Sequence, residues 1–180
     1  MFSALVVTYN RLDLLKQSLS ALRRQTYQDI EIIVANNGST DGTAHYLAEI
    51  VDEDNRLKVV HFDENHWSLD DPNMPMAVCT SAALELATGE YVWYQNDDDM
   101  VADDYLEKMV SLFEGNTECT TASGLPVSID FDGKVMENGP RVSNYRPRYM
   151  PGHLLALNVS KGAGVMFNSP GPLFSIKREL

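Results

Sequence analysis

Three consecutive carboxylates, Asp97, Asp98 and Asp99, directly follow a short apolar segment of the chain. Like charges at this spacing repel and raise one another's pKa, so they are costly to place at the end of a buried strand. A hard divalent cation such as Mg²⁺ removes that cost, because it binds carboxylate and phosphate oxygens together. The run therefore predicts a metal site. The alternative is a solvated acidic turn that caps the next helix, since Asp103 and Asp104 follow closely.

A second polar cluster, Thr8-Tyr9-Asn10-Arg11, follows the first apolar run of the chain. Its backbone and hydroxyl groups could cradle a nucleobase, with Arg11 near phosphate. The plainer interpretation is a helix N-cap, in which Asn10 caps the helix that follows. Four scattered histidines argue against a histidine-based zinc site, and the sequence has neither a P-loop nor a Gly-x-Ser-x-Gly elbow.

A third cluster offers hydrogen-bond donors and acceptors that suit a base and a ribose; its members are Asn36, Asn37, Ser39 and Asp41. The plainer interpretation is an Asn-Gly turn. His66 and Trp67 lie in a polar loop and could stack on a base or a sugar, although a lone aromatic residue in a loop more often packs on the surface.

Apolar periodicity places these clusters on a framework of alternating strands and helices. The expected strands are Phe2–Val7, Ile30–Val34, Leu57–Phe62 and Tyr91–Tyr94. The expected helices run from Leu12 to Leu22, from Thr43 to Val51 and from Met76 to Ala87 with Gly89 ending it. A fourth is expected to begin at an Asp103 cap, to bury Leu106 and Phe113 and to end at Gly115. Alternation of this kind predicts an α/β fold with a mostly parallel sheet. Ligands bind beyond the carboxyl ends of such strands, where all three polar clusters lie.

After residue 115 the apolar period changes. Val127, Ile129 and Phe131 alternate, and Asp132-Gly133 predicts a hairpin turn. Two apolar runs end the chain, Gly164–Phe167 and Leu173–Ile176. We therefore expect one domain in two parts, residues 1–115 and residues 116–180.

The net charge of −12 argues against nucleic acid as the main partner. Residues 1–140 carry 8 basic and 25 acidic side chains, whereas residues 141–180 carry six basic side chains against Glu179 alone. This basic end predicts either a solvated surface or a segment that faces phosphate, an acidic glycan or an anionic membrane. Cys79 and Cys119 do not suggest a disulfide framework, and the N-terminus does not resemble a signal peptide, so a cytoplasmic protein is expected.

The order of these motifs resembles family 2 glycosyltransferases of the GT-A fold across roughly residues 3–113. The matching stretches are Leu5-Val6-Val7-Thr8-Tyr9-Asn10-Arg11, Gln25-Thr26-Tyr27, Glu31-Ile32-Ile33-Val34, Asn37-Gly38-Ser39-Thr40-Asp41-Gly42-Thr43, Ala87-Thr88-Gly89-Glu90-Tyr91 and Asn96-Asp97-Asp98-Asp99. The end of the chain, Leu173-Phe174-Ser175-Ile176-Lys177-Arg178-Glu179, also resembles the family's strand after the acceptor-side loop.

The resemblance implies a nucleoside-diphosphate-sugar donor, commonly a UDP-sugar, with Mg²⁺ or Mn²⁺, and inversion at the anomeric carbon. Residues 1–115 would then bind the donor, and residues 116–180 would form part of the acceptor side. Carried over by position, Asp98 would be the main metal ligand, with Asp97 on the ribose or sharing the metal and Asp99 as a further candidate. Thr8 would sit near the base, and Asn36 or Asn37 would read its edge.

Several positions depart from the family pattern. Asn36 and Asn96 stand where the family often has carboxylates, and Thr80 and Ser81 stand where it usually has an Arg-Asn pair. No arginine occurs between Arg56 and Arg141.

Glu179 is the only carboxylate side chain after Arg141, whereas an inverting transfer needs a base on the acceptor hydroxyl. We therefore expect the base to lie beyond Leu180, in a chain that is truncated or naturally short, with Glu179 as the candidate within it. Two alternatives remain: a non-catalytic nucleotide-sugar-binding module, and a nucleotidyltransferase, which would usually carry a glycine-rich basic loop after its first strand. The acceptor would be a glycan, a lipid-linked sugar or a small molecule. An incomplete domain would also expose an apolar face that could pair two copies.

Overall fold

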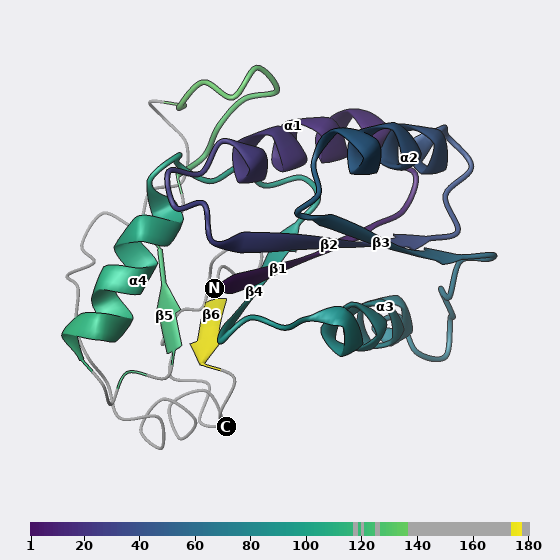
Figure 1. Ribbon diagram of the computed structural model, residues 1–180. Helices are drawn as coiled ribbons and strands as arrows, with labels where there is room; N and C mark the ends of the chain where they lie inside the picture. The colour runs from purple at the N-terminus through teal and green to yellow at the C-terminus, as the bar shows by residue number, and fades with distance from the viewer. Residues whose placement is uncertain (117–118, 120, 125–126, 137–173, 178–180) are drawn as a thin grey trace. The chain divides into compact units, whose positions relative to one another are not determined.

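The computed structural model describes residues 1–116, 119, 121–124, 127–136 and 174–177 (Figure 1). The chain forms two compact units. One contains Met1–Ser123 and Leu173–Leu180, and the other contains Gly124–Pro172. The sheet and the polar clusters belong to the first unit.

The first unit is built on a six-stranded sheet in the order β3-β2-β1-β4-β6-β5. Its first four strands run parallel, while β6 is antiparallel to both β4 and β5. The strands are β1 (Phe2–Thr8), β2 (Ile30–Asn37), β3 (Leu57–Phe62), β4 (Tyr91–Asn96), β5 (Thr121–Ser123) and β6 (Phe174–Lys177). The helices are α1 (Leu12–Arg23), α2 (Thr43–Glu53), α3 (Met74–Leu86) and α4 (Tyr105–Gly115).

Helices cover both faces of the sheet, with α1 and α2 on one side and α3 on the other (Figure 1). In β1, Phe2 and Val6 pack into the core with α1, α2 and α4, whereas Leu5 and Val7 pack with α3. A strand buried on both faces is apolar at nearly every position, and this is why β1 reads as a continuous apolar run. The predicted α/β fold with a mostly parallel sheet is confirmed.

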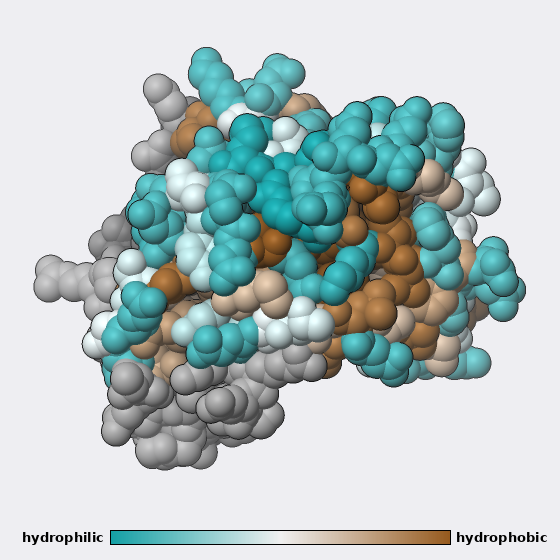
Figure 2. All heavy atoms as spheres, viewed as in Figure 1, coloured by the Kyte–Doolittle hydropathy of each residue, from teal (hydrophilic) through white to brown (hydrophobic). Residues whose placement is uncertain are grey.

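Strand β3 lies at one edge of this sheet. Its residues Val59, Val60 and Phe62 are only partly buried. In the space-filling view, apolar residues gather between α2 and α3, where this edge lies (Figure 2).

Two predicted strands end too early. β2 continues to Asn37 and β4 to Asn96, because both keep pairing with β1: Thr8 lies opposite Asn36, and Val7 lies opposite Asn96. The polar residues expected in loops therefore begin inside the sheet, where their backbone groups are held by the strand ladder.

The predicted cap of α1 by Asn10 is wrong. The amide N–H of Leu12 donates to Asp41 Oδ2 at 3.0 Å, and Asn10 instead accepts from the amide of Thr40 through Oδ1 at 2.7 Å. Asn10 adopts a left-handed backbone conformation with φ of 51°, which asparagine tolerates better than most residues. The start of α1 is thus capped from another segment.

The predicted cap of α4 by Asp103 is also wrong. Asp104 occupies the N-cap position without a side-chain capping bond. The buried Gln25 supplies it instead, because its Oε1 accepts from the amide of Leu106 at 3.0 Å. Its Nε2 donates to the carbonyl of Ala102 at 2.8 Å, which joins the segment after α1 to the loop before α4.

Gly89 does not terminate α3, because that helix ends at Leu86 with Ala87 already extended. The glycine is required by a close approach to β1. A Cβ at this position would lie 2.7 Å from Ser3 Oγ and 2.8 Å from the backbone nitrogen of Ser3. Gly89 therefore lets the α3–β4 connection pass over the start of the sheet.

Glu31 is a buried carboxylate that ties this connection to the sheet. Its Oε1 accepts hydrogen bonds from the Ser3 hydroxyl, both the amide and the hydroxyl of Thr88, and the amide of Gly89. Its Oε2 pairs with Lys58 Nζ at 2.6 Å. Burial raises its pKa, but the bonds from Lys58, Ser3 and Thr88 outweigh burial and lower the pKa to about 2.

The described part of the second unit confirms the predicted turn at Asp132-Gly133, where Gly133 has a φ of 78°. Ile129 and Val135 form a single antiparallel bridge, and Phe131 is exposed. The expected alternating strand is therefore limited to that bridge. None of the helices in the described ranges combines the length and hydropathy that a bilayer span requires.

Glu31→Gln tests the buried carboxylate. Because the pKa is lower in the folded chain, the charged group stabilises the fold above its unfolded pKa, and this contribution is lost as the pH falls toward about 2. We expect a loss of about 2–3 kcal/mol in the free energy of unfolding at neutral pH, shrinking below a pH of about 4. Urea denaturation across a pH series measures it.

Glu49→Gln is the matched control. Glu49 is exposed on α2 and meets His45 at 3.4 Å, so we expect a change below about 0.5 kcal/mol. Equal losses in the two variants, or a loss for Glu31→Gln that does not depend on pH, would contradict the role given to Glu31.

Candidate functional site

The loops that follow β1, β2 and β4 lie side by side at the carboxyl edge of the sheet, as the sequence predicts. The amide of Asn10 donates to Ser39 Oγ at 3.0 Å, which joins the first loop to the second. Arg11 reaches from the first loop to Asp97 and Asp98 after β4. Strand order explains this convergence, because β1 lies between β2 and β4.

Arg11 bridges two of the three consecutive carboxylates. A single guanidinium nitrogen, Nη1, lies 3.2 Å from Asp97 Oδ1 and 2.9 Å from Asp98 Oδ2. The Asp97 side chain is 8% exposed, against 42% for Asp98 and 51% for Arg11. In this cluster the Asp97 carboxylate is buried, whereas the Asp98 carboxylate and the Arg11 guanidinium are accessible.

Burial raises the pKa of Asp97, and the neighbouring charge of Asp98 adds to the rise, while the Thr8 hydroxyl and Arg11 oppose it. The pKa of Asp99 is also raised, chiefly by burial, although a hydrogen bond from Asn96 opposes the change. Both carboxylates therefore hold their charge at a cost that a cation at the site would reduce.

The acidic turn is held from beneath by Gln95, a residue that the sequence reasoning missed. Gln95 is fully buried, and its Nε2 donates to the carbonyls of Asn96 at 3.1 Å and Asp99 at 2.7 Å. Ser18 of α1 donates to the same Asn96 carbonyl at 3.1 Å. A glutamine inside an otherwise apolar strand was the available signal, because a buried amide must find hydrogen-bond partners.

The donor set partly fits a divalent cation. Within the described ranges, no three His, Cys, Asp or Glu side chains come together as a metal site. However, Asp97 and Asp98 direct one oxygen each toward the same positive centre. Thr8 Oγ1 is buried beside them without a hydrogen bond of standard geometry. Such a pair suits Mg²⁺ or Mn²⁺, which take further ligands from phosphates and water. Asp99 is engaged by Asn96 Nδ2 at 2.8 Å.

Asn36 is placed to shape the loop after β2. It is 2% exposed, its Oδ1 accepts from the amide of Ser39 at 3.1 Å, and its Nδ2 lies 3.2 Å from His61 Nδ1. Asn36 could hydrogen-bond to a nucleobase only through the donors and acceptors that these two contacts leave free. Tyr9, in contrast, is 41% exposed at the neighbouring loop.

Asn37 fastens the loop after β3 against the loop after β2. Its Oδ1 accepts from the amide of His66 at 3.0 Å, and its Nδ2 donates to Asn65 Oδ1 at 2.7 Å. The His66 ring packs edge-on against Phe62, with ring centres 4.7 Å apart. Trp67 remains 56% exposed, whereas His66 is partly buried, so of the two predicted stacking residues Trp67 is the more accessible to a ligand.

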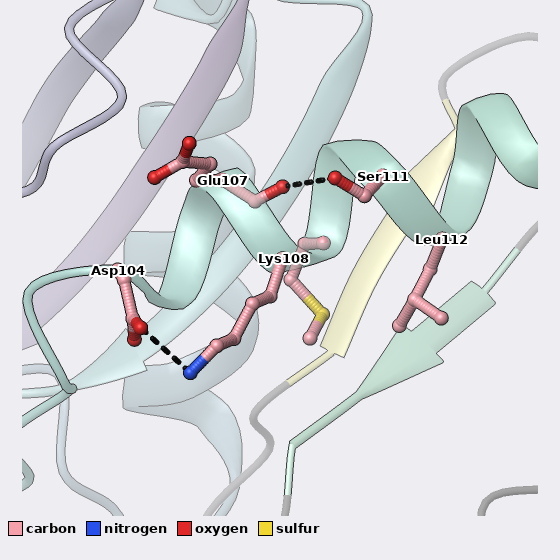
Figure 3. A pocket seen from close by; sticks show the side chains of 6 residues that line it. Asp104, Glu107, Lys108, Ser111 and Leu112 are labelled. Atoms are coloured by element: carbon pink, nitrogen blue, oxygen red, sulfur yellow. Dashed lines mark hydrogen bonds and ion pairs between the residues drawn. The ribbon is translucent and has the colours of Figure 1, made fainter.

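A hollow on α4 is not part of this cluster (Figure 3). Its lining residues all come from one helix and the residue before it: Asp104, Glu107, Lys108, Met109, Ser111 and Leu112. Lys108 Nζ pairs with Asp104 Oδ2 at 2.7 Å, and Ser111 donates to the Glu107 carbonyl at 3.0 Å. Asp104 is thus neutralised within its own helix, separately from Asp97 and Asp98.

A mostly parallel sheet with helices on both faces, and with carboxylates, amides and an arginine at its carboxyl edge, defines an α/β domain of the class that binds its ligands at that edge. The sequence profile described as glycosyl transferase family 2 matches residues 3–169, and the chain belongs to this family.

Curated relatives carry matching names. The putative glycosyltransferase EpsH of Bacillus subtilis (strain 168) is 28% identical over 166 residues, or 92% of this chain and 45% of that protein. A Campylobacter jejuni protein, GalNAc(5)-diNAcBac-PP-undecaprenol beta-1,3-glucosyltransferase, is 27% identical over 78% of this chain and 45% of its own length. The chain therefore spans less than half the length of these relatives.

Solved structures agree on the fold. The mannosyltransferase PcManGT from Pyrobaculum calidifontis, in complex with GDP-Man and Mn²⁺, superposes with a TM-score of 0.60 at 25% identity, covering 73% of this chain and 37% of that one. TarS 1-349 of S. aureus, in complex with UDP, gives a TM-score of 0.54 at 25% identity, covering 64% and 32%.

Gly38→Ala tests the contact between the loops after β2 and β3. Gly38 has a φ of 71°, and an added Cβ would overlap the Glu64 carbonyl carbon and lie 2.7 Å from the Asn65 nitrogen. Both loops would have to separate, so we expect a loss of about 1–3 kcal/mol in unfolding free energy, measured by chemical denaturation.

Gly115→Ala is the control. This residue ends α4 and nothing lies within 4 Å of an added Cβ, so the change should be neutral or stabilising by up to about 1 kcal/mol. A loss in this variant similar to that of Gly38→Ala would mean that the loop contact is not the cause.

Proposed function

We propose that this chain is the donor-binding part of a glycosyltransferase that moves a sugar from a nucleoside diphosphate, preferably UDP, to an acceptor hydroxyl with inversion at the anomeric carbon. The observation that carries the proposal is the Arg11–Asp97–Asp98 cluster at the carboxyl edge of a family 2 sheet. Its paired carboxylates could hold a divalent cation that also binds the diphosphate, and its accessible guanidinium could pair with a phosphate.

The nucleotide would lie across the loops after β1 and β2. Thr8, Tyr9 and Asn10 would border the base, with Asn36, Asn37 and Ser39 shaping the opposite wall. Tyr9 is the exposed ring of the first loop and offers a stacking surface. The UDP complex of TarS supports uridine as the base, while the GDP-Man complex of PcManGT makes guanosine the base to compare against it.

Asp98 and Asp97 would hold Mn²⁺ or Mg²⁺, with Asp99 as a further candidate and Asp97 also within reach of a ribose hydroxyl. When bound, such an ion withdraws charge from the departing diphosphate as a Lewis acid. Arg11 adds a second positive group that orients the phosphates. The Mn²⁺ complex of PcManGT supports the use of a divalent cation.

The acceptor would be a glycan, a lipid-linked sugar or a small molecule. An inverting transfer also needs a general base that takes the proton of the acceptor hydroxyl. We assign this role to none of the described carboxylates, since those at the site are placed for the donor. Glu179, the candidate within the chain, lies outside the described residues. Most of the basic segment, residues 141–180, also lies outside them, so membrane contact and pairing of two copies stay predictions, as does a cytoplasmic location.

Asp98→Ala tests the metal assignment. We expect the metal-dependent part of UDP binding to disappear, a loss of at least about tenfold in affinity, because the accessible oxygen donor is removed. Isothermal titration calorimetry with UDP, with and without Mn²⁺, measures it. Absence of metal-dependent binding of any nucleoside diphosphate to the unchanged protein would overturn the proposal.

Asp104→Ala is the control, because that carboxylate pairs with Lys108 on α4 and should leave UDP binding unchanged. Equal effects of the two variants would mean that the acidic run is only a charged turn. Release of UDP from donor sugars in the presence of acceptors then separates an enzyme from a binding module.

A further inference from the structure

The two carboxylates of the site share one nitrogen rather than binding two separate cations. Arg11 Nη1 lies 3.2 Å from Asp97 Oδ1 and 2.9 Å from Asp98 Oδ2, so the positive centre sits where both oxygens converge. Two carboxylate oxygens converging on one centre is also the arrangement that a hard divalent cation uses. The guanidinium therefore occupies the electrostatic position that the proposed metal would take.

Asp97 needs a countercharge whether or not a metal is bound. Its side chain is 8% exposed and is followed by another carboxylate, and a buried charge without a partner is strongly destabilising. The other arginines in the described ranges are engaged elsewhere: Arg23 and Arg56 with Asp54, and Arg24 with Ser20 and Asp103. The countercharge therefore comes from Arg11.

The Arg11 side chain can leave the carboxylates while its backbone stays in place. The preceding residue, Asn10, is fixed by hydrogen bonds to Ser39 and Thr40, and the carbonyl of Arg11 accepts from the amide of Leu15 at 2.9 Å. The side chain itself is 51% exposed and carries a long flexible stem. Exchange of the guanidinium for another cation therefore requires only side-chain rotation.

We propose that Arg11 acts as a stand-in for the metal: its guanidinium neutralises Asp97 and Asp98 in the free protein, yields that place to the divalent cation, and then pairs with the donor diphosphate. The inference rests on the metal and donor sites of the proposed function. Metal and donor binding become coupled, because the metal frees Arg11 and the diphosphate offers it a new partner. In the absence of donor, Arg11 therefore lowers the affinity of the site for the metal.

The test is titration of the full 180-residue chain and its Arg11→Gln variant with Mn²⁺ alone and with UDP alone. Removing the competing charge should make Mn²⁺ bind about three- to tenfold more tightly, the size expected for one half-exposed ion-pair contact. The same variant should bind UDP about three- to tenfold more weakly in a chelator, because a phosphate partner is lost. Opposite changes for the two ligands are the signature of exchange.

Arg24→Gln is the matched control, since it makes the same chemical change at the C-cap residue of α1, an arginine that contacts Ser20 and Asp103. It should leave both affinities within about twofold of the unchanged chain. Arg11→Lys keeps a positive charge and should also keep the low Mn²⁺ affinity, which guards against misfolding of the glutamine variant. Thermal melting adds a readout, because Arg11→Gln should gain more stability from Mn²⁺ than the unchanged chain does.

Equal Mn²⁺ affinity in Arg11→Gln and the unchanged chain would overturn the inference and leave the proposed function standing. Weaker Mn²⁺ binding in Arg11→Gln would also overturn it, since the guanidinium would then support the metal rather than compete with it. Failure of every variant to bind Mn²⁺, with or without UDP, would remove the proposed metal dependence and the inference together.

Discussion

The carboxylate of Asp97 is almost wholly buried at the end of β4, and the rest of the site is arranged around its charge. A buried carboxylate is tolerated when a positive group and hydrogen-bond donors offset the lost hydration. Arg11 supplies the positive group from the loop after β1. This pairing requires the ends of β1 and β4 to be neighbours, and their parallel register makes them so. The order of the strands therefore determines whether the buried charge of Asp97 has a partner.

Around that charge, the backbone is held rigidly while the side chains that would meet a ligand are left accessible. Gln95 and Ser18 hold the acidic turn by its carbonyls, and Asn37 fastens the neighbouring loops together. Tyr9 and Trp67, in contrast, are substantially exposed. A preformed frame of this kind lowers the ordering cost of binding, since only a few side chains lose freedom when a ligand arrives.

The chain belongs to glycosyl transferase family 2, which suggests what kind of ligand this site would bind. In the proposed function, a nucleoside-diphosphate sugar would bring two negative phosphates to a site whose own carboxylates repel them, so positive charge would have to lie between the two. In the proposed function a divalent cation and Arg11 share that task. The exchange inferred for Arg11 explains how the protein remains stable before either ligand binds. Because the chain spans less than half the length of the curated relatives, acceptor recognition stays a proposal.

The sequence alone determined the α/β class, the core positions of the strands and the three loops that meet at the carboxyl edge, because apolar periodicity and parallel-strand geometry are local or general properties. It also singled out the residues of the acidic run. The helix caps were wrong, because Asp41 caps α1 from 29 residues away and Gln25 caps α4 from 81 residues away. The pairing of Arg11 with Asp97 spans 86 residues. Only the tertiary structure decides such contacts, since they depend on which strands are neighbours and in what register.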